Sequence, residues 1–379
     1  MKIARVTARL LEATPQSGVT FGLGDFSTYS MVLVEITSDD GVTGYGEAIA
    51  RRGGQMTVAA VEHLFGDVLI GKDPENIEGL WVLMVDQLRR WGHTQGVVVE
   101  AISGIDIALW DLVGKARNAP VWKLLTGAGR KEVPVYASSV YIADPNVMVD
   151  QALEQQQRGF SSLKVKIGRP HDRGGIWADL QVLEQIRSSV DDGMGLVVDA
   201  NGAYDASTAI RLARAMESLD IGWFEEPLPP DDVTGYERLH SMTSTPLARG
   251  ETDFGLWTLR DIMQRRTVDV VQPDLARCGG VTAARHVWTL TYFMNLAFAP
   301  HTGFSGGLSQ LAALHVAAAA PELLALEYMF IDNPVRELFI DGYPKPVDGK
   351  LPVPQSSGLG LELDFELIDR LTVHPSRRI

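Results

Sequence analysis

The chain has 379 residues, of which 45% are hydrophobic and 22% are charged, and its formal net charge is −14. This length predicts either two domains or one large α/β barrel with an added module. The negative charge argues against nucleic acid and anionic membranes as partners, because both would be repelled, whereas a local cationic pocket can still bind a small acid.

The N-terminal stretch, MKIARVTARLLEATPQ, interrupts its apolar residues with charges, so we expect no signal-peptide core. No run reaches the ~18 uninterrupted apolar residues of a membrane span. The single cysteine, Cys278, excludes an internal disulfide and suits a reducing compartment. We therefore expect a cytoplasmic protein.

Residues 1–125 are predicted to form strands first and helices afterwards. The segments 3–13 and 29–39 are rich in β-formers, and the second runs into the turn signal DDG. Helical patterns follow around 55–70, 74–90 and 94–117. This order is typical of an α+β module.

From about residue 133 the chain repeats one unit, a short apolar strand, a polar or glycine-rich turn and an amphipathic helix. After Glu327 the repeat stops, and we expect the last fifty or so residues to wrap back onto the first module. The proposed division is 1–125, 126–327 and 328–379. Eight strands that alternate with helices predict a parallel TIM-type barrel; they are VPVYASS, SSLKVKI, GLVVDAN, GWFEEP, PLARGE, VDVVQPD, LAFAPH and LLALEY.

Most of these strands finish on an ionisable residue, at steps of 23 to 35 residues, which is the length of a βα unit. Equivalent positions around a barrel meet at its C-terminal face, where the active sites of such barrels lie. The pattern therefore predicts a site built from Lys164, Lys166, Asp199, Glu225, Glu251, Asp274, His301 and Glu327.

Asp199, Glu225 and Glu251 follow neighbouring strands, and three convergent carboxylates need a cation to stay ionised together. Oxygen ligands alone favour a hard ion, Mg²⁺. Each residue also has a structural alternative: Asp199 as a helix cap, Glu225 in a loop, and Glu251 paired with Arg249. Asn201 shares the face of Asp199 and is expected to support the site.

The other side of the site is predicted to carry proton-transfer groups. Asp274 precedes His301 by one strand and is placed to orient its ring, although a lone histidine is more often structural. In SSLKVKI, strand alternation puts Lys164 and Lys166 on one face. A half-exposed strand would explain that face alone, but the ring of ionisable residues favours a site. Two adjacent ammonium groups would lower each other's pKa, so we expect Lys166 to serve as a base and Lys164 to bind a substrate carboxylate.

These residues, in the motifs KVK, VDAN, EEP, GET, QPD, PH and LEY, resemble the enolase superfamily and, within it, the mandelate racemase subgroup (the mandelate racemase/muconate lactonizing enzyme family). The resemblance covers nearly the whole chain. It implies a modified TIM barrel of the (β/α)7β type, with an N-terminal α+β capping domain that the C-terminal tail completes. It also favours Glu225 over Glu226 as the metal ligand.

The resemblance implies one Mg²⁺ per subunit on Asp199, Glu225 and Glu251, and removal of the proton α to a carboxylate to give an enediolate. Lys166 and His301 would be acid/base groups on opposite faces. Glu327 would hydrogen-bond the intermediate in its neutral form, which requires a raised pKa. Homo-oligomers, dimers or octamers, are also implied.

Several reactions can follow proton removal in this subgroup. We expect dehydration of an acid sugar (an aldonate or aldarate) to a 2-keto-3-deoxy acid, with racemisation, epimerisation or lactone cycloisomerisation as the alternative. A non-catalytic acid-binding barrel and a Schiff-base aldolase are more remote alternatives. The loops at 19–30 and 50–57 would close over the barrel mouth, where Tyr29, Arg51 and Arg52 are candidate substrate contacts.

Overall fold

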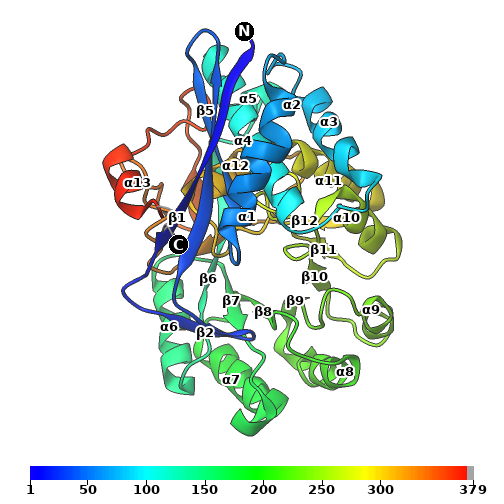
Figure 1. Ribbon diagram of the computed structural model, residues 1–379. Coiled ribbons are helices and arrows are strands. Elements are labelled where there is room, and N and C mark those ends of the chain that lie inside the picture. Colours follow the sequence, from blue (N-terminus) through cyan, green and yellow to red (C-terminus); the bar gives the residue numbers. More distant parts are fainter. Residues whose placement is uncertain (374–379) are drawn as a thin grey trace, which may run out of the picture.

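The computed structural model describes residues 1–373. Its N-terminal part is an antiparallel sheet of order β1-β4-β5, formed by β1 (Ile3–Ala13), β4 (Tyr29–Ser38) and β5 (Thr43–Ile49). The 20-residue helix α4 (Val97–Ala116) packs against β5. Glycine at position 46 permits this close approach, because a Cβ there would lie 2.1 Å from the carbonyl oxygen of Gly104. The expected α+β module is therefore present (Figure 1).

The predicted helices of this module occur within a few residues of their expected positions. The pattern at 55–70 forms one nearly continuous helical run with a π-helical centre, and the pattern at 74–90 begins later than expected. The short α5 had no counterpart in the prediction. The remaining elements of the module are α1 (Gly54–Ala59), η1 (Ala60–Gly66), α2 (Asp67–Leu69), α3 (Ile77–Arg89) and α5 (Val121–Thr126).

The second part confirms the predicted barrel-like fold. Parallel strands follow the order β12-β11-β10-β9-β8-β7-β6-β13 in one curled sheet, and a helix follows each strand but the last. The strands are β6 (Glu132–Val140), β7 (Ser162–Lys166), β8 (Gly195–Asp199), β9 (Ile221–Glu225), β10 (Leu247–Arg249), β11 (Val270–Val271), β12 (Ala297–Phe298) and β13 (Leu326–Met329). The helices are α6 (Pro145–Gln157), α7 (Gly175–Ser189), α8 (Ala206–Ala215), α9 (Val233–His240), α10 (Gly255–Gln264), α11 (Gly280–Met294) and α12 (Gly307–Ala319), with short 3₁₀ turns η2 (His171–Arg173) and η3 (Glu217–Leu219).

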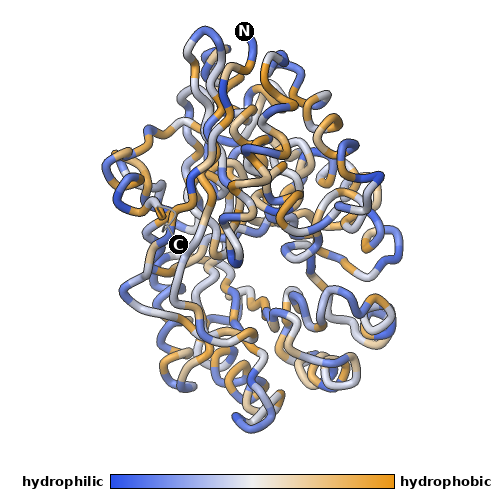
Figure 2. Tube along the Cα trace, in the orientation of Figure 1, coloured by the Kyte–Doolittle hydropathy of each residue, from blue (hydrophilic) through white to orange (hydrophobic). Residues whose placement is uncertain are grey.

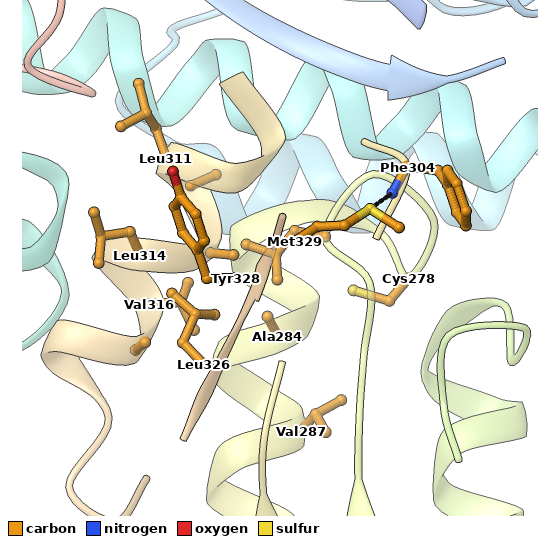
Figure 3. Packing of buried hydrophobic residues seen from close by; sticks show 14 of the residues in the cluster. Cys278, Ala284, Val287, Phe304, Leu311, Leu314, Val316, Leu326, Tyr328 and Met329 are labelled. Carbon is orange, nitrogen blue, oxygen red and sulfur yellow. Dashed lines mark hydrogen bonds between the residues drawn. The ribbon is translucent and has the colours of Figure 1, made fainter. Parts of the chain in front are cut away.

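Alternation along these strands separates two apolar layers. Inside the sheet, one small cluster fills the barrel below the site; it consists of Tyr136, Val197, Trp223, Ala248, Val270 and Ala299. Outside, the main core lies between strands and helices, as Figure 3 shows for Leu326 on β13 beside α11 and α12. Figure 2 shows the same division, with hydrophobic strands at the centre and hydrophilic residues on the outer turns of the helices.

The segment after β13 contacts both earlier parts of the chain. β14 (Lys350–Pro352) pairs antiparallel with β6, and α13 (Phe365–Leu371) packs against β1. The Val121 N–H donates to the carbonyl of Gly358, which ties the tail to α5. These contacts suit the expected return of the tail to the cap, while the division at 125 and 327 stays a prediction.

A small hairpin, β2 (Val19–Phe21) and β3 (Gly24–Phe26), reaches from the first module over the end of the barrel (Figure 1). Phe21 and Phe26 stack on Phe304, with ring centroids 5.2 and 4.2 Å apart, respectively. Across residues 1–373, none of the helices has the length and apolar character needed to span a bilayer.

Candidate active site

The two lysines of β7 are buried. The exposed fractions of Lys164 and Lys166 are 0% and 3%, so the alternative interpretation, a strand with a solvated outer face, is wrong. The Lys164 ammonium lies 2.6 Å from Glu225 Oε1, and the Lys166 ammonium donates to Asp199 and, at 3.3 Å, to Asn201. The ladder places Lys166 opposite Asp199 on β8, and Asp199 opposite Glu225 on β9, which explains these contacts.

Asp199, Glu225 and Glu251 converge at the C-terminal ends of their strands. One oxygen from each lies within 4.8 Å of the others, and all three side chains are buried. Burial is the main cause that raises the pKa of Glu225 to about 7, against the opposing charge of Lys164. Burial and then the charge of Glu251 likewise raise the pKa of Glu226 to about 8. The cluster thus holds three carboxylates close together in a place shielded from water.

The structure does not support the alternative structural roles of the three carboxylates. The side chain that caps α8 is Asp205, not Asp199. Arg249 pairs with Asp253, at 2.7 Å, and not with Glu251. Glu226 turns away at φ +36° and accepts a hydrogen bond from Thr252, whereas Glu225 faces the cluster.

His301 lies between two carboxylates on the other side of the cluster. Its Nδ1 is 2.8 Å from Asp274 Oδ2, and its Nε2 is 2.7 Å from Glu251 Oε2. Burial alone would lower the pKa of His301, but the charges of Glu251 and Glu327 outweigh it and raise the pKa to about 10. In return, His301 overcomes the effect of burial and holds the pKa of Glu251 well below its usual range.

Two sequence-based expectations about protonation are wrong. Burial opposes the charged form of Lys164, but Glu225 and Glu327 reverse this and hold its pKa well above the usual value, so Lys164 does not lose affinity for its proton beside Lys166. Burial would raise the pKa of Glu327, but Lys164 at 2.7 Å and then His301 lower it below the usual value. Lys164 has carboxylates as its nearest charged neighbours and Glu327 has cations, and these neighbours decide the sign of each pKa shift.

Two further residues support Glu225 and were missed from the sequence. Trp223 Nε1 and Gln272 Nε2 both donate to Glu225 Oε2, at 3.0 and 2.7 Å. Trp223 lies two residues before Glu225 on β9, and therefore on the same face, and Gln272 follows the end of β11 directly, two residues before Asp274. Both could have been found by looking two residues before each predicted site residue at the end of a strand.

The candidate substrate contacts from the cap fall in three different surroundings. Arg51 reaches the site, with Nη1 3.8 Å from Glu251 Oε1 and Nη2 donating to the carbonyl of Gly303. Arg52 is exposed. Tyr29 is fully buried under the hairpin, where its ring packs on Phe26 and Phe304, and it is not brought to the carboxylates.

The donor set is suitable for a divalent cation. Three buried carboxylates, with one oxygen from each within 4.8 Å of the others, supply only oxygen ligands, which hard cations prefer. The lysines and His301 surround the cluster without taking part in it as ligands. The residues that could hold a metal are therefore Asp199, Glu225 and Glu251.

Comparison with known proteins agrees with this geometry. Residues 5–126 match the model of the mandelate racemase/muconate lactonizing enzyme N-terminal domain, and residues 147–367 match that of the enolase C-terminal domain-like family. The chain is 33% identical to D-galactarolactone cycloisomerase of Agrobacterium fabrum, over 97% of this chain and 98% of the relative. It is also 33% identical to arabinonate dehydratase of Saccharolobus solfataricus, over 87% of each chain.

Solved structures of similar fold carry magnesium. A racemase from Streptomyces coelicolor with bound magnesium superimposes with a TM-score of 0.89, at 29% identity, over 98% of this chain and 100% of that one. A mutant L-talarate/galactarate dehydratase, liganded with Mg and L-glucarate, gives a TM-score of 0.86 at 28% identity, over 98% and 92% of the two chains. The chain is therefore an enzyme of the mandelate racemase/muconate lactonizing enzyme family, in the mandelate racemase subgroup of the enolase superfamily.

Proposed function

We propose that this enzyme is a Mg²⁺-dependent acid-sugar dehydratase, which converts an aldonate or aldarate to a 2-keto-3-deoxy acid and water. The observation that carries the proposal is the buried placement of Asp199, Glu225 and Glu251 between Lys166 on one side and His301 on the other. One Mg²⁺ per subunit on these carboxylates would supply positive charge where the substrate carboxylate gains negative charge.

Lys166 and His301 have complementary tasks in this proposal. Lys166 Nζ, as the free amine, takes the α-proton, and the C–H electrons form the enediolate of the substrate. His301 Nε2, as the imidazolium, gives its proton to the β-hydroxyl, which leaves as water while the Cα–Cβ double bond forms. The resulting enol becomes the 2-keto acid by gaining a proton at C3 and losing its hydroxyl proton.

Other residues bind and orient. Lys164 keeps its proton beside Glu225 and Glu327, so it can attract the substrate carboxylate throughout the reaction. Asp274 holds the Nδ1 side of His301 and leaves Nε2 directed at the cluster. The hairpin that carries Phe21 closes the barrel mouth and excludes water from the enediolate. Assembly into dimers or octamers stays a prediction.

A second candidate function is cycloisomerisation of a sugar lactone. The observation that favours it is the 33% identity to D-galactarolactone cycloisomerase, which extends over 97% of this chain. Such a reaction would use the same abstraction of an α-proton, but it would release no water.

The test is proton NMR in D₂O with Mg²⁺ and a panel of aldonates, aldarates and aldarolactones. We expect loss of the α-proton signal and a new signal from the 3-deoxy carbon, which takes up one deuteron from D₂O, in one substrate or a few. Lys166→Ala should abolish the reaction. Consumption of a lactone without water loss would establish cycloisomerisation instead, and inversion of the α-carbon alone would establish a racemase. A reaction that proceeds fully in Lys166→Ala would overturn the proposed role of that lysine.

A further inference from the structure

Phe304 has a backbone conformation that aromatic residues rarely adopt. Its φ is +58°, in the left-handed region, which bulky side chains disfavour. Most of the other non-glycine residues with positive φ in residues 1–373 are asparagines or aspartates, which tolerate this region. Strained residues of this kind persist only where the surrounding structure holds them, and they cluster at functional sites. Phe304 lies three residues after His301, so the strain is next to a proton-transfer group of the site.

The segment that contains Phe304 folds back over the ring of His301. A Cβ on Gly303 would lie 2.7 Å from His301 Nε2, so no larger residue fits at this position. On the other side of Phe304, Ser305 Oγ lies 3.4 Å from Asp274 Oδ2, the same oxygen that contacts His301 Nδ1. The two neighbours of Phe304 therefore lie against the imidazole and against its carboxylate partner, and a displacement of Phe304 would disturb both.

Hydrogen bonds fix the backbone of this segment to β13. The Thr302 N–H donates to Glu327 Oε2 at 2.9 Å, and the Phe304 N–H contacts Met329 Sδ at 3.3 Å (Figure 3). The backbone of the segment thus belongs to the barrel, and the part that it presents to the cap is the ring of Phe304.

Side chains of the cap enclose this ring, and only 6% of Phe304 is exposed. The ring centroids of Phe26 and Phe21, from the two strands of the hairpin, lie 4.2 and 5.2 Å away, and that of Tyr29 lies 6.3 Å away. The Arg51 guanidinium lies 5.8 Å from the centroid of the same ring. Aromatic packing of this kind is favourable, so the closed hairpin supplies contacts that offset the strain in the backbone of Phe304.

We propose that Phe304 is a positioning residue that couples closure of the hairpin to His301. The closed hairpin holds Phe304 in the left-handed conformation and thereby keeps its neighbours against the imidazole. When the hairpin opens, the backbone relaxes and His301 loses the support that directs its proton. Lys166 is held by Asp199 and Asn201 instead, so removal of the α-proton does not depend on this coupling. The inference rests on the proposed role of His301 as an acid, and not on which product forms.

The test measures two steps by proton NMR in D₂O, with the full-length enzyme and Mg²⁺. The His301-dependent step is the one that His301→Asn abolishes, whichever product the substrate panel reveals. We expect Phe304→Ala to slow this step about tenfold, the usual cost of a left-handed backbone outside glycine, and to leave exchange of the α-proton unchanged.

A glycine at the same position separates strain from simple packing. Phe304→Gly should retain more of the His301-dependent step than Phe304→Ala, because glycine adopts the left-handed conformation without strain. If Phe304 served only to fill space, glycine would do no better than alanine, since it fills even less.

Phe26→Ala tests the part of the hairpin without changing the segment itself, and Phe26 is only partly buried. This variant should also slow the His301-dependent step. The double variant with Phe304→Ala should be no slower than Phe304→Ala alone, because both changes remove the same contact. Leu23→Ala, at the exposed tip of the hairpin, is the matched control and should change neither step.

Hydrogen exchange followed by mass spectrometry detects the coupling without any substrate. The amides of residues 302–309 should exchange about tenfold faster in Phe26→Ala than in the wild type, and at the wild-type rate in Leu23→Ala. If no substrate in the panel turns over, the proposed function fails alone and this measurement still decides the coupling. If His301→Asn abolishes no step, the proposed role of His301 fails and the inference fails with it.

Three results would overturn the coupling while leaving the proposed function intact. They are unchanged exchange of residues 302–309 in Phe26→Ala, an equal fall of both chemical steps in Phe304→Ala, and a slower His301-dependent step in Phe304→Gly than in Phe304→Ala.

Discussion

His301 and Asp274 form a buried pair in which Nδ1 of the ring lies 2.8 Å from Oδ2 of the carboxylate. The pair bridges β11 and β12 just beyond their paired residues, so both backbone and side chains fix its geometry. Asp274 therefore orients the ring and stabilises its charged form without lying among the metal-type carboxylates.

This pairing predicts that the two proton transfers can be separated. Asp274→Asn should lower kcat for water loss by about 10²- to 10⁴-fold, the usual contribution of one acid–base group, because His301 loses both its orientation and its counter-charge. Exchange of the substrate α-proton in D₂O should continue, since it needs Lys166. Proton NMR measures both rates in one sample. An equal fall in both would contradict the division of tasks.

Glu225 and Glu226 are adjacent in sequence, but we expect only Glu225 to contribute to Mg²⁺ binding. Glu225 lies within the three-carboxylate cluster, whereas Glu226 bonds Thr252. Glu225→Gln should weaken Mg²⁺ binding by more than about 100-fold, since changes even outside the ligand shell cost 10- to 100-fold. Glu226→Gln, the matched control, should retain binding. The measurement is the rise in melting temperature with added Mg²⁺, and a rise of equal size in both variants would show that Glu225 is no ligand.

Strand periodicity was enough to predict much of this site. The alternation in SSLKVKI separates Leu163 and Val165 from the two lysines, and the repeat length brings successive strand ends to one face of the sheet. Both relations depend only on local geometry that every parallel strand shares. The strand positions were therefore predictable to within a few residues.

Protonation and the roles of the cap depend on distances that no local pattern contains. The pKa of Lys164 rises because Glu225 and Glu327, from strands far apart in sequence, lie 2.6 and 2.7 Å from its ammonium. Tyr29 belongs to a segment that was expected to contact substrate, yet it packs under the hairpin. Tertiary packing decides both features, and a sequence read one segment at a time does not show it.

Gly22 sets how the hairpin sits on the barrel. A Cβ at this position would lie 2.3 Å from the carbonyl oxygen of Ala200, just after β8. Gly22→Ala should disfavour the closed position by about 1–3 kcal/mol, the usual cost of overpacking, and lower kcat/KM by about 5- to 150-fold. Leu23→Ala, at the 69% exposed tip, is the control and should behave as wild type. Steady-state kinetics give the answer, and unchanged kcat/KM in Gly22→Ala would mean that closure does not need this contact.

The burial of His315 leads us to expect that the chain becomes less stable as the pH falls. It is fully buried on α12, where Nδ1 accepts the Trp122 N–H and Nε2 lies 3.1 Å from the carbonyl of Leu359, so it connects the barrel, the cap and the tail. Burial lowers its pKa from 6.5 to about 4, against the smaller effect of the Leu359 contact. The imidazole therefore stays neutral in the folded chain at a pH where the unfolded chain binds a proton.

The sign of the pH dependence follows from this difference. Above pH 6.5 His315 does not change how the free energy of unfolding depends on pH. Between pH 6.5 and 4 the unfolded state gains a proton that the folded state does not. Over this range the free energy of unfolding therefore falls by about 3 kcal/mol in total. His315→Gln can make both hydrogen bonds without titrating, so it should remove this part of the slope. Urea unfolding at pH 4 to 8 measures both chains, and the difference between them cancels the slope from other groups. Parallel curves for the two chains would show that His315 takes up its proton equally well when folded, and that the junction of α12, α5 and the tail opens to admit it.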